Sequence, residues 1–150
     1  MSESDLKVRL QDAMKAAMRA RERARLDAIR LILAEIQRIE VDERIVLDDA
    51  RVLAVLDKMT KQRRDSAAQY RSAGREELAA QELVEIEIIA SFLPTALTPA
   101  EITALVEQAI ASSGASSARD MGKVMAILKP ELQGRADIGA VSAQVKTRLG

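Results

Sequence analysis

Residues 26–39 read LDAIRLILAEIQRI, and this stretch decides the fold class. Its apolar residues recur at the three- and four-residue spacing of an α-helix, which places them together on one broad face. The members of this face are Leu26, Ile29, Ile32, Leu33, Ile36 and Ile39. A face this wide is typical of a helix that packs into a protein core. We therefore expect a core helix here, followed by a connector over residues 41–47.

The segments on both sides of this helix show the same periodicity. Before it, an apolar stripe covers residues 6–17 and loses register at residues 20–23, where we expect a bend. After it, a third helix is expected to start at Asp48 or Asp49, because a short carboxylate caps exposed backbone N–H groups. Gly74 is expected to end that helix, since glycine tolerates the left-handed conformation of a C-terminal cap.

A linker bounded by prolines follows the fourth helix. That helix is expected to end at Pro94, because the residue before a proline is biased away from the helical conformation. Residues 98–101 read TPAE, which combines an N-cap threonine, a proline at the first helical position and the glutamate of a capping box. The sequence thus predicts two domains, a helical N-terminal domain over 1–94 and a C-terminal domain over 98–150.

The C-terminal domain contains two further helix starts. Residues 117–120 read SARD, which predicts a second capping box, and Asp137 is expected to cap the last helix. Pro130 is expected to close the helix between them. No stretch shows a convincing strand pattern. We therefore predict an all-α fold, with an N-terminal four-helix segment followed by a C-terminal three-helix domain.

The composition excludes several classes of function. The 150 residues contain no Cys, His or Trp, and their only aromatic residues are Tyr70 and Phe92. Without thiols and imidazoles there is no Ser-His-Asp triad and no ordinary transition-metal site. Two aromatic residues cannot form the base-stacking platform of a single-strand RNA reader. We expect no intrinsic catalysis, no cofactor and no bound metal.

The apolar stretches also bear on location. Each is far shorter than the roughly 20 residues that a membrane span requires. No apolar segment of the secretory type follows the first residues. We therefore expect a cytoplasmic protein without a membrane partner.

Charge is balanced overall but uneven along the chain. The 23 Lys and Arg residues equal the 23 Asp and Glu residues in number, yet residues 1–75 carry 17 basic and 13 acidic groups. The densest basic stretch spans residues 15–30, and a second, over 58–64, contains Lys58, Lys61, Arg63 and Arg64. Such stretches attract polyanions. More often they are a solvated helix face with ion pairs four residues apart.

The most distinctive stretch, RDMGKVM, covers residues 119–125. A glycine inside a helix costs about 0.5–1 kcal/mol relative to alanine, so close approach of another helix or of a ligand should offset the cost of Gly122. If this helix and the later Gly-Arg turn share a face, their cations form a small phosphate site. Its members are Gly122, Lys123, Gly134, Arg135 and Lys146. Alternatively, Gly122 permits helix packing and Lys123 is solvated; the residues alone leave both open.

Several stretches together resemble the YqeY-like family, also called the GatB/YqeY domain family, along nearly the whole chain. The matching stretches of the N-terminal half are 14–18, 26–32, 61–66, 73–75 and 92–94. Those of the C-terminal half are 120–125, 134–137 and 141–146. Ordered matches at matching separations make this resemblance far more specific than any single motif.

The resemblance implies that the C-terminal domain is similar to the tail domain of the B subunit of glutamine-dependent tRNA amidotransferases. In that enzyme the tail contacts tRNA, whereas catalysis lies in other domains and subunits. The family often carries the label of a carbon–nitrogen ligase with glutamine as amido donor, and these 150 residues have no room for that chemistry.

We therefore expect a non-catalytic accessory protein that binds tRNA or another structured RNA through its C-terminal domain. Amidotransferase subunits are further expected partners, and DNA is not expected. Two alternatives stay open: a helical adaptor for a protein partner, and a component that acts only within an amidotransferase complex.

Overall fold

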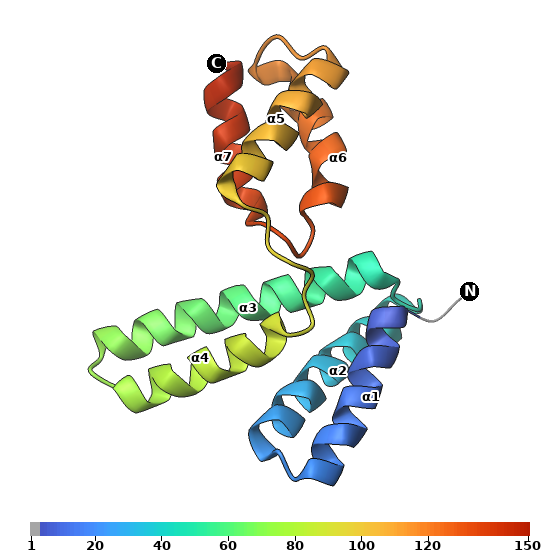
Figure 1. Ribbon diagram of the computed structural model, residues 1–150, viewed down its shortest axis with the longest axis vertical. Coiled ribbons are helices and arrows are strands. Elements are labelled where there is room, and N and C mark those ends of the chain that lie inside the picture. The colour runs from blue at the N-terminus through green and yellow to red at the C-terminus, as the bar shows by residue number, and fades with distance from the viewer. Residues whose placement is uncertain (1–3) are drawn as a thin grey trace. The chain divides into compact units, whose positions relative to one another are not determined.

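The computed structural model describes residues 4–150, which contain seven α-helices, one short 3₁₀ segment and no strand (Figure 1). The predicted all-α fold is confirmed. Contacts divide the chain into two compact units, Met1–Leu93 and Pro94–Gly150. Each unit has its own apolar core.

The N-terminal unit consists of two helical hairpins. Its helices are α1 (Asp5–Ala20), α2 (Arg23–Glu43), α3 (Asp49–Ser72) and α4 (Glu76–Ala90). Figure 1 shows α1 beside α2 and α3 beside α4. The predicted apolar face of α2 is confirmed at its centre, because Ile29, Ile32 and Ile36 are fully buried. Phe92 belongs to the same core, whereas Tyr70 lies half-buried on α3.

Caps and left-handed residues set the helix boundaries of this unit. The expected bend is confirmed: α1 ends at Ala20, and Arg21 takes the left-handed conformation with φ of 59°. Asp48 caps α3 by accepting a hydrogen bond from the Arg51 N–H at 2.9 Å. The expected connector over 41–47 begins too early, because α2 continues through Glu43 and ends at the left-handed Arg44. Neither Gly nor Pro marks that end in the sequence.

The start of α1 is fastened to the start of α3. Ser4 is buried, and its hydroxyl donates a hydrogen bond to the carboxylate of Asp49. The same carboxylate accepts the backbone N–H of Leu6 at 3.1 Å. These two bonds hold the pKa of Asp49 below its usual value. Asp49 therefore joins two helices, while its neighbour Asp48 is the cap.

The C-terminal unit is a bundle of three helices. They are α5 (Pro99–Ser113), α6 (Met121–Leu132) and α7 (Ile138–Leu149), and a 3₁₀ segment (Ala118–Asp120) runs directly into α6. Its core includes the fully buried side chains of Val106, Val124, Leu128, Leu132 and Val145. Each helix contributes at least one of them, so all three helices share a single core.

The predicted signals of this unit have mixed outcomes. The capping box at Thr98 is confirmed in both directions, with bonds of 3.1 Å to and from Glu101. The one at Ser117 is wrong, because its side chain caps nothing; instead Asp120 accepts the N–H of Ser116 at 3.0 Å. Asp137 caps α7 as expected.

Pro130 does not close α6, which continues to Leu132. A proline removes its own hydrogen-bond donor and crowds the carbonyl four residues earlier, but the next bonds of the helix survive: the Gln133 N–H bonds to the Lys129 carbonyl at 3.0 Å. Leu132 is fully buried, so the burial of its side chain favours the extra turn.

No helix within residues 4–150 has the length and apolar character needed to cross a lipid bilayer.

Candidate nucleic-acid interface

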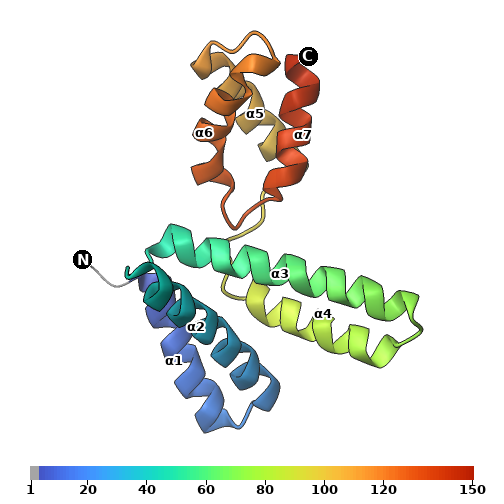
Figure 2. The same ribbon diagram turned by 180° about the vertical axis from the view of Figure 1, so that it is seen from behind.

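The five predicted site residues lie at two ends of one helix pair. Helices α6 and α7 are joined by a short turn and run antiparallel, as Figure 2 shows. Lys123 is the third residue of α6 and Lys146 lies in the last turn of α7, so both occupy the same end of the pair. Arg135 follows the opposite end of α6, and the helix between Lys123 and Leu132 is about 14 Å long. The fold therefore brings the two lysines toward one end but not Arg135.

Arg135 is occupied within its own unit. Its Nε donates a hydrogen bond to the carbonyl of Thr95 at 2.9 Å, and its carbonyl accepts the N–H of Leu97 at 2.9 Å. The preceding Gly134 makes the turn possible, because its φ of 74° lies in the left-handed region that favours glycine. Arg135 thus fastens residues 95–97 to the C-terminal unit.

Replacing Arg135 by alanine is therefore expected to loosen residues 95–97. Loss of a hydrogen bond worth about 1 kcal/mol should raise local opening, and with it cleavage there, about fivefold. Limited proteolysis with a protease of broad specificity, read by mass spectrometry, measures this rate. Lys129→Ala is the matched control, because Lys129 is exposed. Equal cleavage rates in both variants would argue against the fastening role.

Gly122 is open to solvent rather than packed against a helix. It is the second residue of α6, and a Cβ built on it would have no neighbouring atom within 4 Å. The explanation that Gly122 permits close helix packing is therefore wrong. Its backbone forms accessible surface beside Lys123, and close approach of a ligand is the explanation that stays open.

Lys123 is accessible despite a nearby carboxylate. Its side chain is 72% exposed, and its Nζ lies 3.9 Å from Asp120. An exposed pair at this separation contributes little stability. Asp120 is ionised because the Ser116 N–H, helped by the charge of Lys123, holds its pKa below the usual value. Lys123 can therefore exchange Asp120 for a phosphate at small cost.

Arg119 is a cation of the same end that we did not select from the sequence. It is exposed and lies in the 3₁₀ segment, four residues before Lys123. Because that segment runs directly into α6, Arg119 lies at the same end of α6 as Lys123. Its position four residues before Lys123 was the feature of the sequence that could have identified Arg119. The predicted capping box at Ser117 instead suggested that Arg119 only belongs to a helix start.

The second basic stretch, over 58–64, is partly used inside the N-terminal unit. Arg63 donates to Glu85 of α4 at 2.7 Å, and its side chain is only 15% exposed. Lys58, Lys61 and Arg64 are exposed. This stretch therefore presents three cations rather than four.

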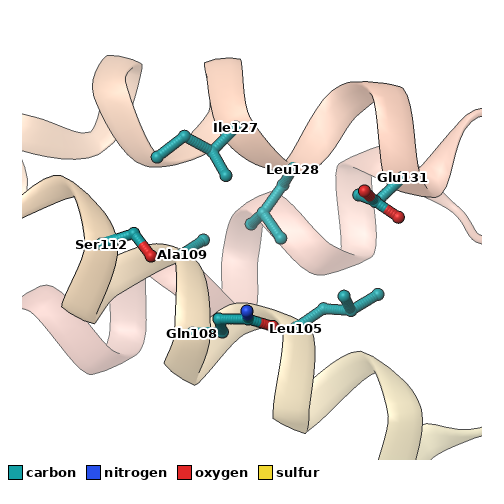
Figure 3. Close-up of a pocket in the computed structure, with 7 residues that line it drawn as sticks. All are labelled: Leu105, Gln108, Ala109, Ser112, Ile127, Leu128 and Glu131. Atoms are coloured by element: carbon teal, nitrogen blue, oxygen red, sulfur yellow. The ribbon is translucent and has the colours of Figure 1, made fainter.

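A small groove separates α5 from α6 (Figure 3). It has a volume of about 130 Å³, and Leu128 projects toward α5 between Ala109 and Leu105. Its other lining residues are Gln108, Ser112, Ile127 and Glu131. Ile127 is 42% exposed. The groove is small and of mixed polarity, with room for about one side chain of a protein partner.

Large exposed apolar side chains also occur in the N-terminal unit. They are Val8, Met18, Leu31, Val41, Val46, Leu83 and Val84. Val8 and Met18 lie on α1, Leu31 and Val41 on α2, and Leu83 and Val84 on α4. Single exposed apolar residues are normal on protein surfaces, so their exposure alone does not define a docking face.

Comparisons with known proteins place the chain in a family. It is 29% identical over 146 residues to the "Altered inheritance of mitochondria protein 41, mitochondrial" of Pyrenophora tritici-repentis, covering 95% of this chain and 80% of that protein. The protein of the same name from Vanderwaltozyma polyspora is 30% identical over 102 residues, covering 66% and 55% of the two chains. An uncharacterised protein of Schizosaccharomyces pombe is 32% identical over 78 residues, covering 52% and 63%. The family model described as "Yqey-like protein" matches residues 7–149, and the chain therefore belongs to the YqeY-like family.

Proposed function

We propose that this chain is a non-catalytic accessory protein that binds tRNA or another structured RNA through one end of its α6–α7 pair. The observation that carries the proposal is the group of exposed cations Arg119, Lys123 and Lys146, beside the open backbone of Gly122. Lys and Arg side chains bind phosphates, and exposed backbone lets a sugar–phosphate chain approach closely. The resemblance of this unit to the amidotransferase tail supports tRNA as the RNA.

The mode of binding follows from the residues available. No aromatic residue lies in 94–150, so this surface offers no aromatic ring on which a base could stack. Recognition would therefore depend on the phosphate backbone and on RNA shape. Affinity of this kind falls steeply with salt, because each neutralised phosphate releases counterions.

The double variant Lys123→Ala/Lys146→Ala is expected to bind tRNA more weakly and with less dependence on salt. If both lysines contact duplex phosphates, the slope of log K against log salt should fall in magnitude by about 1.8. Fluorescence anisotropy with labelled tRNA at several salt concentrations measures both quantities. Thermal unfolding should be unchanged, because solvated cations add little stability.

The matched control is Lys58→Ala/Lys61→Ala, which removes two exposed charges from α3. Gly122→Ala is a further variant, since its added methyl meets no atom of the protein but would stand within the proposed contact. Wild-type affinity and slope in the Lys123/Lys146 variant, with loss in the control, would place the RNA contact on α3 instead.

The groove between α5 and α6 favours a second candidate function, a helical adaptor that binds a protein partner. Amidotransferase subunits are one class of such partners implied by the resemblance. If wild-type protein binds no tRNA near physiological salt, we would adopt this second function, and Ile127 would be the first residue to test.

A further inference from the structure

The turn between α1 and α2 gathers a dense group of cations. Residues 15–30 contain six basic and two acidic residues, a balance of +4 in a chain whose net charge is zero. Five of the six basic residues are exposed: two lie near the end of α1, one lies between the two helices, and two lie on α2. We name this set the cationic corner; its members are Lys15, Arg19, Arg21, Arg23 and Arg30.

Most of the cationic corner is unpaired. Several cations elsewhere in this unit lie in ion pairs, namely Lys7–Glu40, Arg38–Glu35, Arg51–Glu43 and Arg63–Glu85, whereas others, such as Arg9, Arg44 and Arg75, are exposed and do not. Within the corner Arg23 lies 3.3 Å from Asp27, with side chains 86% and 53% exposed. The other four members have no ion-pair partner among residues 4–150. A solvated face balanced by neighbours four residues away, the common explanation of such a stretch, does not describe these four.

The corner is held on a fixed frame rather than on a free loop. The guanidinium of Arg25 lies 5.0 Å from the centre of the Phe92 ring, and its Nη1 donates to the Ser91 hydroxyl at 3.3 Å. Phe92 is buried in the core. These contacts attach the first turn of α2 to the segment that follows α4, so the backbone of this turn is held in place.

The arginines in the first turn of α2 oppose local helix stability, whereas Arg19 in the last turn of α1 favours it. The first turn of α2 contains Arg23 and Arg25 and no acidic residue, and the side chain of Glu22 makes no capping bond. Positive charge near a helix N-terminus is unfavourable, and α1, α4 and α5 carry acidic residues there. Arg21 occupies a left-handed position that favours glycine. Sequences break local rules in this way chiefly at functional sites.

The chemistry of the corner fits phosphodiesters better than a lipid surface. Five of the six basic residues in 15–30 are Arg, whose planar fork binds phosphate through two parallel hydrogen bonds. Membrane-surface helices require a broad apolar face. Within 15–30, Met18 is the one exposed large apolar residue. An RNA backbone is therefore the better occupant.

We propose that the cationic corner binds the phosphate backbone of structured RNA, as a second contact besides the end of the α6–α7 pair. The class of ligand rests on the proposed function, but the corner itself does not depend on Lys123 or Lys146. With two separate contacts, one protein molecule could bind two parts of a folded RNA. Each contact would add to the salt dependence of binding.

The test replaces Arg19, Arg21 and Arg30 together by Gln, which removes the charge but keeps a polar side chain with similar helix propensity. The control replaces Arg9, Arg44 and Arg75 by Gln. These three are also exposed, and Arg44, like Arg21, is a left-handed residue after a helix. Binding of labelled tRNA is measured at several salt concentrations. The corner variant should lower the slope of log K against log salt by about 2.7 and weaken Kd by about tenfold or more near 0.1 M salt. The Kd of the control variant should stay within about twofold of the wild-type Kd.

The outcomes separate the two proposals. Loss of binding in the corner variant with retention in the Lys123/Lys146 variant supports the corner and overturns the α6–α7 site. Wild-type slope and affinity in the corner variant, with intact folding by circular dichroism, overturn the corner alone. If wild type binds no tRNA but binds phosphatidylcholine vesicles containing phosphatidylserine through these arginines, the RNA proposal is overturned in favour of a lipid surface.

Discussion

The Leu128→Ala variant is expected to unfold the C-terminal unit at moderate temperature. Leu128 is only 1% exposed and lies at the centre of that unit's core. Replacing a buried leucine by alanine costs about 2–5 kcal/mol, through lost transfer energy and the cavity left behind. A single small core of this kind rarely supplies more than about 3–5 kcal/mol. The substitution therefore removes most of the stability that the unit has.

Hydrogen exchange read by mass spectrometry separates this effect by segment. Amides of α5, α6 and α7 should lose protection, while those of α1 to α4 should keep it, because the two cores share no residue. Ile127→Ala is the matched control one position away, on a side chain that is 42% exposed. Full protection of α5–α7 in the Leu128 variant would contradict our account of this core.

The Glu40→Ala variant is expected to lose about 1–3 kcal/mol of unfolding free energy, because both oxygens of Glu40 accept hydrogen bonds. One accepts the Lys7 Nζ of α1 at 2.8 Å, and the other accepts the buried N–H of Leu47 at 2.9 Å. The ion pair is largely sheltered, since its side chains are 18% and 15% exposed. Without Glu40, a sheltered ammonium and a buried N–H lose their partner.

Glu43→Ala is the control, measured like Glu40→Ala by urea unfolding. Glu43 lies on the same helix and pairs with Arg51 at 2.7 Å, but both side chains are about half exposed. An exposed pair is screened by water and salt, so its loss should be much smaller. Equal losses in the two variants would show that burial does not strengthen the Lys7–Glu40 pair.

The effect of Glu40 also has a defined pH dependence. The hydrogen bond from Lys7, with that from Leu47, holds the pKa of Glu40 below its ordinary value. A lowered pKa in the folded state stabilises the protein above the ordinary glutamate pKa of about 4.3, and this stabilisation is lost as the pH falls below it. The difference in unfolding free energy between wild type and Glu40→Ala should therefore become smaller as the pH falls from 7 to 3. A constant difference would assign the effect to side-chain packing.

The helices were predictable from the sequence because their signals are local. Apolar spacing places Ile29, Ile32 and Ile36 on one face, and Thr98 with Glu101 closes a capping box within four residues. The failures are local as well. Pro130 usually ends a helix, yet burial of Leu132 two residues later outweighs that preference. Whether the helix ends at the proline or continues to the buried leucine depends on tertiary packing, which local sequence signals do not describe.

The candidate site was less predictable, because its cations find partners far away in the sequence. Arg135 binds the carbonyl of Thr95, forty residues earlier, and Arg63 binds Glu85, twenty-two residues later. A count of basic residues in the sequence does not distinguish these arginines from Lys123, which faces solvent. Only the arrangement of the helices distinguishes an arginine that fastens the fold from a lysine that faces solvent.

The position of Tyr70 determines which part of the protein intrinsic fluorescence can report on during unfolding. Without tryptophan, Tyr70 is the only useful intrinsic fluorophore, and it lies half-buried on α3. Its emission reports on the N-terminal unit, while residues 94–150 are silent at that wavelength. Far-ultraviolet circular dichroism, by contrast, sums the helices of both units. Melting curves from the two methods should therefore differ whenever the units unfold at different temperatures, and fitting either curve alone to a two-state model would misstate the free energy.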